Sequence, residues 1–311
     1  MSHLQLKLSR WGSSSYETPL SIQREKNRLK EYVHIVDDDS DADIIVVHSK
    51  RKVDERIIQC CPSLKYVITT TSGYDHIDVP LLQSKNITAI RMPLLRRDAV
   101  VETTLGLILQ GTRRIQDIRS KSIQDGWLRH ELPHFNLMEL KEQRIGIVGS
   151  SGVIGSKMVE ILEILGCKNI FCCDIKNHSR SNVSIQDIAE SCNIISLHCN
   201  LNASTYHLCD ASFFSNVQKG SILINTARGG LIDESEAFRA IENHTLSFLG
   251  LDVFETEPYG DIAIQKKYDN VVLLPHAAGF SNNLLQNITE QLVQVCRCIV
   301  EEKNIPYIIS S

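Results

Sequence analysis

Short apolar, β-branched segments alternate with amphipathic segments along most of the chain, and this pattern constrains the fold more than any other feature. Parallel strands joined by crossover helices produce such an alternation, because helices cover both faces of the sheet. We therefore predict an α/β protein. In the first hundred residues, strands are predicted at Leu4–Leu8, Asp43–His48, Tyr66–Thr70 and Thr88–Met92, and helices at Ser21–Tyr32, Val53–Cys60 and Val79–Ser84.

A second alternation follows a long helix predicted at Asp98–Ile115, which is apolar almost all round and is therefore expected to be buried. A looser segment, Gln124–Phe135, separates the two. The pattern predicts six further strands with intervening helices, which make a complete doubly wound nucleotide-binding domain. These strands are Arg144–Val148, Asn169–Asp174, Asn193–His198, Ser221–Asn225, Leu246–Val253 and Val271–Leu274, and a last helix is predicted at Asn283–Glu302.

Length and composition exclude several classes of protein. A chain of 311 residues suits two lobes, and a net charge of −4 gives no reason to expect a nucleic-acid partner. No apolar stretch approaches the roughly 20 residues that span a bilayer, and the first ten residues lack the apolar core of a signal peptide. The ten cysteines include no C-x-x-C pair, so we expect reduced thiols in a cytoplasmic protein and no metal site.

A glycine-rich turn follows the predicted strand Arg144–Val148, with the sequence Gly-Ser-Ser-Gly-Val-Ile-Gly from Gly149 to Gly155. Glycines let the backbone turn tightly beside a pyrophosphate, and the N-terminus of the next helix offers it free N–H groups. The spacing G-x-x-G-x-x-G is one residue longer than the usual dinucleotide motif. A glycine-rich turn without a ligand is the alternative interpretation of this segment taken alone.

Asp174 strengthens the nucleotide interpretation, because it ends the next predicted strand 22 residues after Gly152. A carboxylate at about this separation accepts hydrogen bonds from the ribose hydroxyls and repels a 2′-phosphate, so NAD is favoured over NADP. Lys176 and Arg180 follow closely and weaken this preference. An ordinary acidic residue at the end of a strand is the alternative.

Polar clusters also follow three later strands, in the segments 223–230, 250–258 and 274–279. Ligands bind outside the carboxyl ends of the strands of an open α/β sheet, so these clusters should converge on the cofactor crevice. The segments resemble the patterns N-x-x-R-G, D-V-F-x-x-E-P and P-H-x-x-G of the D-isomer-specific 2-hydroxyacid dehydrogenase family. The segments 72–78, 99–102 and 196–205 are similar to further family segments, and the resemblance runs from about Asp43 to Gly279.

The chemistry of this family explains the residue types. Hydride delivery to a ketone leaves an oxyanion that needs a proton, which a histidine can supply near neutral pH. A glutamate bonded to that histidine favours the imidazolium and orients its ring, and an arginine can hold the substrate carboxylate through two N–H bonds. The resemblance assigns these roles to His276, Glu257 and Arg228. Taken singly, each residue could instead be structural or solvated.

The resemblance also implies cofactor and substrate contacts. The backbone of Val153 and Ile154 would face the pyrophosphate beside Gly152, Asp252 would bind the nicotinamide carboxamide, and Thr226 and Ala227 would line its pocket, with Thr205 and Gly279 in the matching segments. Backbone amides around Ser72 and Gly73 would clamp the substrate carboxylate. The implied fold is a Rossmann NAD-binding domain (98–280) inserted into a flavodoxin-like substrate domain (1–97 and 281–311), commonly dimeric through the cofactor domain.

The sequence departs from the family pattern at several positions. One serine is inserted in the glycine turn, Val153 stands where many relatives carry arginine, and Asn200 stands where many carry proline. Lys50 and Arg96 follow first-lobe strands, where the loops should line the substrate pocket with Trp11, His48, Ser49 and Ser72. We predict that Arg96 or Lys50 faces the substrate, which would then bear a second anionic group; solvated surface charges are the alternative.

The sequence thus predicts an NAD-dependent oxidoreductase that interconverts a small 2-oxo acid and its D-2-hydroxy acid. Two other functions remain open at this point. The same Glu–His pair occurs in phosphite-type dehydrogenases, and NAD(H)-sensing corepressor-like proteins share the fold and the three polar residues. A degenerate enzyme that has lost its cofactor is a further alternative, because the glycine turn is altered.

Overall fold

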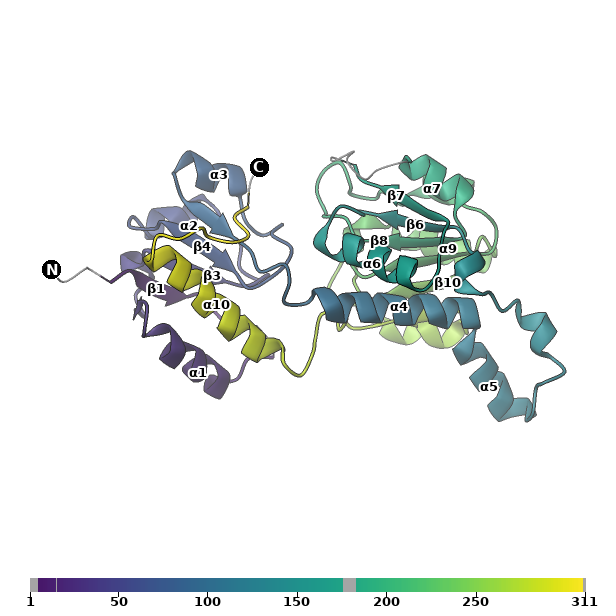
Figure 1. Ribbon diagram of the computed structural model, residues 1–311. Helices are drawn as coiled ribbons and strands as arrows, with labels where there is room; N and C mark the ends of the chain where they lie inside the picture. The colour runs from purple at the N-terminus through teal and green to yellow at the C-terminus, as the bar shows by residue number, and fades with distance from the viewer. Residues whose placement is uncertain (1–4, 15, 176–182, 310–311) are drawn as a thin grey trace. The chain divides into compact units, whose positions relative to one another are not determined.

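The computed structural model describes residues 5–14, 16–175 and 183–309, and these form two compact units (Figure 1). Unit 1 consists of Met1–Arg96 and Ser281–Ser311, and unit 2 of Arg97–Phe280. Both units contain parallel sheets with interleaved helices, which confirms the predicted α/β class. Within the described residues, no helix has the length and apolar character that a membrane crossing requires.

The sheet of unit 1 has the strand order β2-β1-β3-β4-β5, and every pairing is parallel. Its strands are β1 (Lys7–Arg10), β2 (His34–Ile35), β3 (Ile44–Val47), β4 (Tyr66–Thr69) and β5 (Thr88–Ile90). Its helices are α1 (Pro19–Leu29), α2 (Glu55–Cys60), α3 (Val79–Ser84) and α10 (Leu284–Val300). The chain therefore returns to unit 1 through α10 after completing unit 2.

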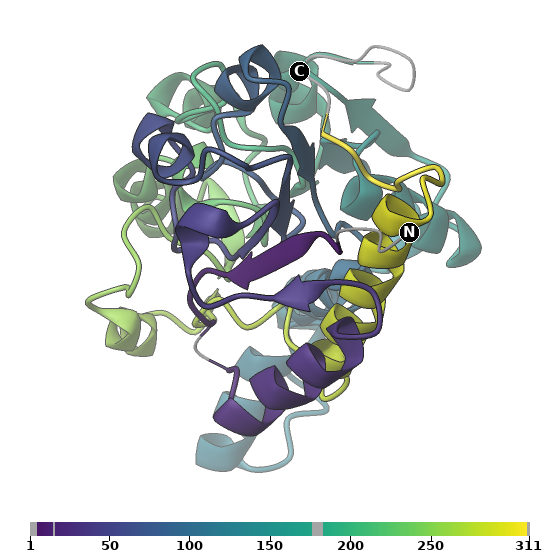
Figure 2. The same ribbon diagram turned by 90° about the vertical axis from the view of Figure 1, so that its left-hand side faces the viewer.

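Both faces of this sheet are covered, as the alternation in β3 shows. Ile44 and Val46 pack in the cluster that includes residues of α1 and α10, whereas Ile45 and Val47 pack with residues of α2 and α3. Successive side chains of a strand point to opposite faces, so four consecutive apolar residues serve two cores. Figures 1 and 2 both show α1 and α10 side by side on one face.

The sheet of unit 2 has the order β11-β10-β9-β8-β6-β7, again wholly parallel. Its strands are β6 (Ile145–Val148), β7 (Ile170–Cys173), β8 (Ile194–Leu197), β9 (Ser221–Asn225), β10 (Leu246–Leu251) and β11 (Val271–Leu273). The chain passes from β6 to β7 on one side and then to β8 on the other. This reversal of strand order lies at the carboxyl ends of β6 and β8, where open α/β sheets bind their ligands.

Helices cover both faces of this sheet as well. Residues of α4 (Arg97–Arg113) and α6 (Val153–Ile164) pack in one apolar cluster, and residues of α7 (Ile185–Ser191), α8 (Ala211–Asn216) and α9 (Glu234–Glu242) pack in the other. The predicted burial of the long helix is confirmed in part, because seven of its residues from Val100 to Thr112 are buried.

The stretch between the predicted helix Asp98–Ile115 and the predicted looser segment Gln124–Phe135 forms an element that was not predicted. A further helix, α5 (Ile115–Asp125), begins after Arg114, whose φ of 50° is left-handed and breaks α4. Figure 1 shows α5 and the chain after it standing away from the sheet of unit 2. None of the residues of α5 is buried. A helix without a buried face carries no clear apolar period, which is why the sequence pattern did not predict it.

Candidate active site

The glycine turn lies at the reversal of strand order in unit 2, between the end of β6 and α6. Gly149 has a φ of 89°, and a Cβ there would lie 2.5 Å from the backbone nitrogen of Cys199. A Cβ on Gly155 would lie 2.1 Å from the carbonyl oxygen of Gly149. A side chain is therefore excluded at Gly149 and at Gly155, and Gly152 is the N-cap of α6.

This geometry fits the pyrophosphate of a dinucleotide. The first N–H groups of α6, at Val153 and Ile154, have no acceptor within the helix, and the helix dipole places partial positive charge beside them. The glycines let the turn pack closely against residues 198–199 and the start of α6, and a phosphate can bind at such a helix N-terminus.

Asp174 follows β7 and is bonded to the same turn. Its carboxylate accepts a hydrogen bond from the amide of Ser151, with distances of 3.0 and 3.1 Å to its two oxygens. The hydroxyl groups of Ser150 and Ser151 also donate to Oδ2 of Asp174. The structure thus brings a carboxylate to the turn, as a ribose-binding residue requires, while Lys176 and Arg180 lie outside the described residues.

Arg228 lies between β9 and the short helix η4 (Gly229–Leu231). Asn225 organises this turn, because its side-chain oxygen accepts from the amide of Ala227 at 3.0 Å and its Nδ2 donates to the carbonyl of Arg228 at 2.9 Å. A Cβ on Gly229 would lie 1.8 Å from the carbonyl carbon of Phe254, so only glycine allows the turn to press against the loop after β10.

His276 and Glu257 come from two different loops, after β11 and β10, and meet through their side chains. Nδ1 of His276 lies 2.7 Å from Oε2 of Glu257, and the other Glu257 oxygen accepts from the amide of Phe254 at 3.1 Å. An ionised carboxylate can only accept, so Nδ1 carries the proton of this bond. His276 itself has a left-handed φ of 55°.

The electrostatics of Glu257 link these residues to Arg228. Burial by itself would raise the pKa of Glu257, but its hydrogen bond to His276 and the charges of His276 and Arg228 hold the pKa below its ordinary value. The carboxylate is therefore ionised at neutral pH. Arg228, Glu257 and His276 are gathered at one edge of unit 2, where the arginine guanidinium also donates to the carbonyl of Ala227.

Asp252 is buried at 1% exposure and holds the loop that carries His276. Its oxygens accept from the amides of Ala277 at 2.7 Å and Ala278 at 3.0 Å, directly before Gly279. Its backbone carbonyl accepts from the amide of His276 at 2.8 Å. Burial raises the pKa of Asp252, and the two amide bonds oppose that rise. A positioning role is thus visible beside the expected contact with a carboxamide.

The two threonines predicted to contact the cofactor are both buried in local hydrogen bonds. Thr226 shares a hydrogen bond of 2.8 Å with Thr104 of α4. Thr205 accepts from the amide of Asn202 and donates to the carbonyl of Asn200, each at 2.8 Å, and so shapes the loop after β8.

In unit 1, the loop after β4 gathers three of the predicted substrate contacts. Ser72 donates to the carbonyl of Pro93 at 3.1 Å, and the carbonyl of Gly73 accepts from Thr71 at 2.7 Å. Arg96 reaches the same loop, because its guanidinium donates to the carbonyl of Thr70 at 2.6 Å. Desolvation lowers the pKa of Arg96 without removing its charge.

Lys50 belongs to the neighbouring loop after β3 and is exposed. Its backbone amide donates to Nδ1 of His48 at 3.3 Å. The structure therefore distinguishes the two candidates for the second anionic group. Arg96 bonds to the loop that contains Ser72 and Gly73, whereas Lys50 is exposed.

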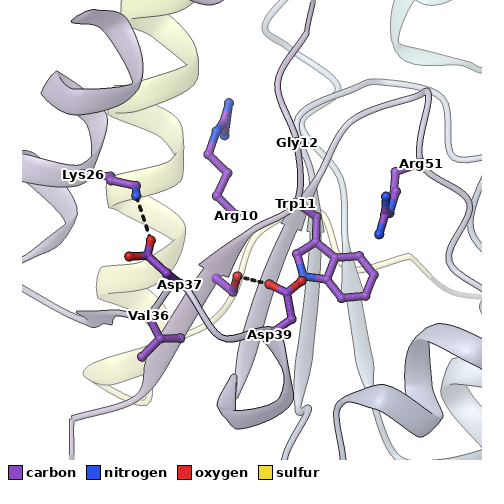
Figure 3. A pocket seen from close by; sticks show the side chains of 9 residues that line it. Arg10, Trp11, Gly12, Lys26, Val36, Asp37, Asp39 and Arg51 are labelled. Carbon is purple, nitrogen blue, oxygen red and sulfur yellow. Dashed lines mark hydrogen bonds and ion pairs between the residues drawn. The ribbon is translucent and has the colours of Figure 1, made fainter. Parts of the chain in front are cut away.

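Polar residues at the end of β1 form a network that the sequence pattern did not predict, and Arg10 and Trp11 of this region line a cavity (Figure 3). The buried guanidinium of Arg10 pairs with Glu17 and, at 3.1 Å, with Glu25. Trp11 packs beside it with the guanidinium of Arg51 5.0 Å above its ring, next to a cavity of about 200 Å³. Desolvation raises the pKa of Glu25, although Arg10 opposes the rise. A sequence offers no local signal for such a pairing across a strand and a helix.

Comparison with known proteins agrees with this geometry. Residues 105–278 match the family model described as D-isomer specific 2-hydroxyacid dehydrogenase, NAD binding domain. A glyoxylate reductase of Thermofilum pendens is 33% identical over 260 residues, which are 80% of this chain and 76% of the relative. An erythronate-4-phosphate dehydrogenase of Bacteroides fragilis is 30% identical over 269 residues, covering 83% and 69% of the two chains.

Among solved structures, the chain is similar to a D-lactate dehydrogenase of Aquifex aeolicus complexed with NAD and lactic acid. The TM-score is 0.80 at 25% identity, over 98% of this chain and 99% of that one. The glycine turn, the carboxylate bonded to it and the matched NAD-binding segment all indicate a nicotinamide dinucleotide as cofactor. The chain belongs to the D-isomer specific 2-hydroxyacid dehydrogenase family, whose members are oxidoreductases that act on the CH–OH group of 2-hydroxy acids with NAD(P).

Proposed function

We propose that the enzyme reduces a 2-oxo acid to the D-2-hydroxy acid, with His276 as proton donor, Glu257 as its partner and Arg228 as the binder of the substrate carboxylate. The observation that carries this assignment is the 2.7 Å bond between Nδ1 of His276 and Glu257, beside the positive charge of Arg228. Nicotinamide, when bound, supplies the hydride to the carbonyl carbon.

The residues of this chain manage the other charges of the reaction. Because Nδ1 of His276 faces Glu257, Nε2 is the nitrogen that gives its proton to the carbonyl oxygen as the alcohol forms. Ionised Glu257 stabilises the imidazolium before the transfer and fixes the plane of the ring. Arg228 neutralises the substrate carboxylate and polarises the adjacent carbonyl. In the oxidative direction His276 accepts the proton of the hydroxyl group.

We further propose NAD rather than NADP as the physiological cofactor, because Asp174 lies against the glycine turn. The amides of Val153 and Ile154 behind Gly152 bind the pyrophosphate. Residues at the ends of β8, β9, β10 and β11 line the nicotinamide side, namely Thr205, Thr226, Ala227, Asp252 and Gly279.

For the substrate we propose a 2-oxo acid with a second anionic group, bound by unit 1. Arg96 supports this, since its half-buried guanidinium lies on the loop that contains Ser72 and Gly73, whose amides would bind the carboxylate. Lys50 could add charge from the adjacent loop. The similarity to an erythronate-4-phosphate dehydrogenase points in the same direction.

We also propose a homodimer formed through unit 2. Trp127 is 86% exposed and Ile123 is 68% exposed, on and just after α5. Ile115, at the start of α5, is exposed as well. Large apolar side chains gathered on one segment are typical of a protein–protein contact, and a second copy would cover them.

The test of the reaction is NADH oxidation by the purified enzyme against glyoxylate, hydroxypyruvate, 2-oxoglutarate, phosphonopyruvate and phosphorylated 2-oxo acids. His276→Ala should lower kcat by about 100-fold or more, the usual contribution of a general acid. His207→Ala is a matched control, because His207 lies 3.2 Å from Glu255 in the same unit but does not touch Glu257. Equal losses in the two variants, or no turnover of any acid by the wild type, would refute the assignment.

The test of the substrate class is the ratio of kcat/KM for a phosphorylated acid to that for glyoxylate. Arg96→Ala should lower this ratio by about tenfold, the effect of roughly 1.4 kcal/mol of lost anion binding. Arg97→Ala is the control, since the neighbouring guanidinium pairs with Asp98. An unchanged ratio in Arg96→Ala contradicts the second anionic group.

A further inference from the structure

The inserted residue of the glycine turn has a structural role of its own. The amide of Gly152 donates to the carbonyl of Gly149 at 3.1 Å, which closes a four-residue β-turn with Ser150 and Ser151 at its centre. The longer spacing therefore does not loosen the approach to α6. It places two serines side by side at the tip of the turn, and both donate to Asp174.

The two serines differ in burial. Ser150 is wholly buried, at 0% exposure, and its hydroxyl donates to Oδ2 of Asp174. Ser151 is partly exposed, and its hydroxyl donates to the same oxygen at 2.9 Å. Water and ligands can therefore compete for the bond made by Ser151, but the bond made by Ser150 is shielded.

We infer that Ser150 determines cofactor specificity by anchoring Asp174, and that the Ser151 hydroxyl holds the place that a ribose hydroxyl takes when the dinucleotide binds. This inference rests on the proposed role of Asp174 in ribose binding. The anchored carboxylate stays beside the turn instead of rotating into solvent. A neutral O–H donor from ribose can replace the O–H of Ser151 without loss of hydrogen bonding.

A 2′-phosphate cannot make the same exchange. It has no proton to donate when fully ionised and would bring negative charge against a carboxylate that cannot move aside. Without the buried bond from Ser150, Asp174 still accepts from the amide and the hydroxyl of the more exposed Ser151. Water can compete for those bonds, so the carboxylate can turn further from the phosphate and reduce the repulsion. Loss of the Ser150 hydroxyl should therefore change the cofactor preference and loss of the Ser151 hydroxyl should not, although the two residues are adjacent and bond to the same oxygen.

The experiment measures the dissociation constants of NADH and NADPH by isothermal titration for the wild type, Ser150→Ala, Ser151→Ala and Asp174→Ala. We expect Ser150→Ala to lower the preference for NADH over NADPH by about tenfold, mainly through tighter NADPH binding. Ser151→Ala should retain the preference and bind NADH as tightly as the wild type or slightly more tightly. Ser156→Ala in α6 is the control, because its hydroxyl lies 3.5 Å from the carbonyl of Val153 and does not approach Asp174.

A preference that is unchanged in Ser150→Ala, or equal losses of NADH affinity in Ser150→Ala and Ser151→Ala, would overturn the inference. Asp174→Ala separates this failure from a failure of the proposed function. If Asp174→Ala abolishes the preference for NADH and Ser150→Ala does not, only the anchoring by Ser150 is wrong. If Asp174→Ala retains the preference for NADH, the proposed role of Asp174 in ribose binding is wrong too. Ser150→Cys, which keeps the size of the buried side chain but donates weakly, should also lower the preference and replaces Ser150→Ala if that variant does not fold.

Discussion

Replacing Glu257 by glutamine removes a charge from the active site while preserving its shape. In the structure Oε2 of Glu257 lies 2.7 Å from Nδ1 of His276, and the two side chains are 35% and 51% exposed. A hydrogen bond to a charged group contributes about 1.5–3 kcal/mol when shielded, whereas an exposed ion pair contributes about 1 kcal/mol or less. Since both side chains are at least a third exposed, we adopt about 1 kcal/mol, which is roughly a fivefold change in proton occupancy.

The assay is the pH dependence of kcat/KM for 2-oxo acid reduction. Reduction requires the imidazolium form of His276, and loss of the Glu257 charge makes that form less stable. The alkaline limb of the profile should therefore move to lower pH in Glu257→Gln. On the acid side, the pKa of Glu257 is lowered. The stabilisation of the imidazolium by Glu257 is therefore fully present above the ordinary glutamate pKa and is lost as the pH falls through the lowered pKa. Glutamine does not titrate, so Glu257→Gln should not show this loss of activity at acid pH.

Glu255→Gln is the matched control, because its carboxylate lies in the same loop but bonds to Tyr206 and His207. It should leave the alkaline limb in place. If Glu257→Gln has the profile of the wild type, or if Glu255→Gln shifts the limb equally, the 2.7 Å pair does not control the proton of His276.

Three further predictions concern the cofactor turn, the oligomeric state and the substrate carboxylate. Gly155→Ala would place a Cβ 2.1 Å from the carbonyl oxygen of Gly149. We therefore expect the free energy of unfolding to fall by about 1–3 kcal/mol in thermal melting, and NADH to bind more weakly in titration. A variant with unchanged stability and affinity would show that the turn is not tightly packed. Trp127→Ser should shift the enzyme from dimer to monomer in sedimentation experiments, and a monomeric wild type would contradict the proposed interface. Arg228→Lys keeps the charge but loses bidentate geometry, so KM for the 2-oxo acid should rise by about tenfold or more, and an unchanged KM would remove Arg228 from carboxylate binding.

Helices and strands were predictable where burial of one face or both faces gives a regular spacing of apolar residues. The predicted bounds of β9 (Ser221–Asn225) and α3 (Val79–Ser84) agree with the structure at both ends, and β3, β4, β6, β7, β8 and β11 are each shorter than predicted by a residue or two. The first strand was displaced, because pairing with β3 selects Lys7–Arg10 rather than the predicted Leu4–Leu8. Leu4 lies outside the described residues.

The two elements that were not predicted, β2 and α5, lack a regular spacing of apolar residues. β2 (His34–Ile35) is a two-residue strand at the edge of its sheet, and α5 buries no residue. Hydrophobic periodicity reports contact with a core, so an edge strand or an unpartnered helix leaves little trace in it.

The candidate site was predictable to the extent that its residues follow strands. Arg228, Glu257 and His276 come after β9, β10 and β11, and the carboxyl ends of parallel strands meet at one edge. The order of residues along the chain therefore predicted which chemistry would gather there. Asn225 and Asp252 were harder to interpret, because their structural role depends on backbone amides that no residue type identifies.

The sequence by itself determined the class of fold and the family, because strand-end motifs and the spacing of apolar residues can be identified in short segments of the chain. Only the tertiary structure showed that the inserted residue joins Ser150 and Ser151 to Asp174, and that Arg10 is buried between Glu17 and Glu25. The physical reason is that a hydrogen bond or an ion pair depends on distance and shielding across strands, which spacing along the chain does not specify.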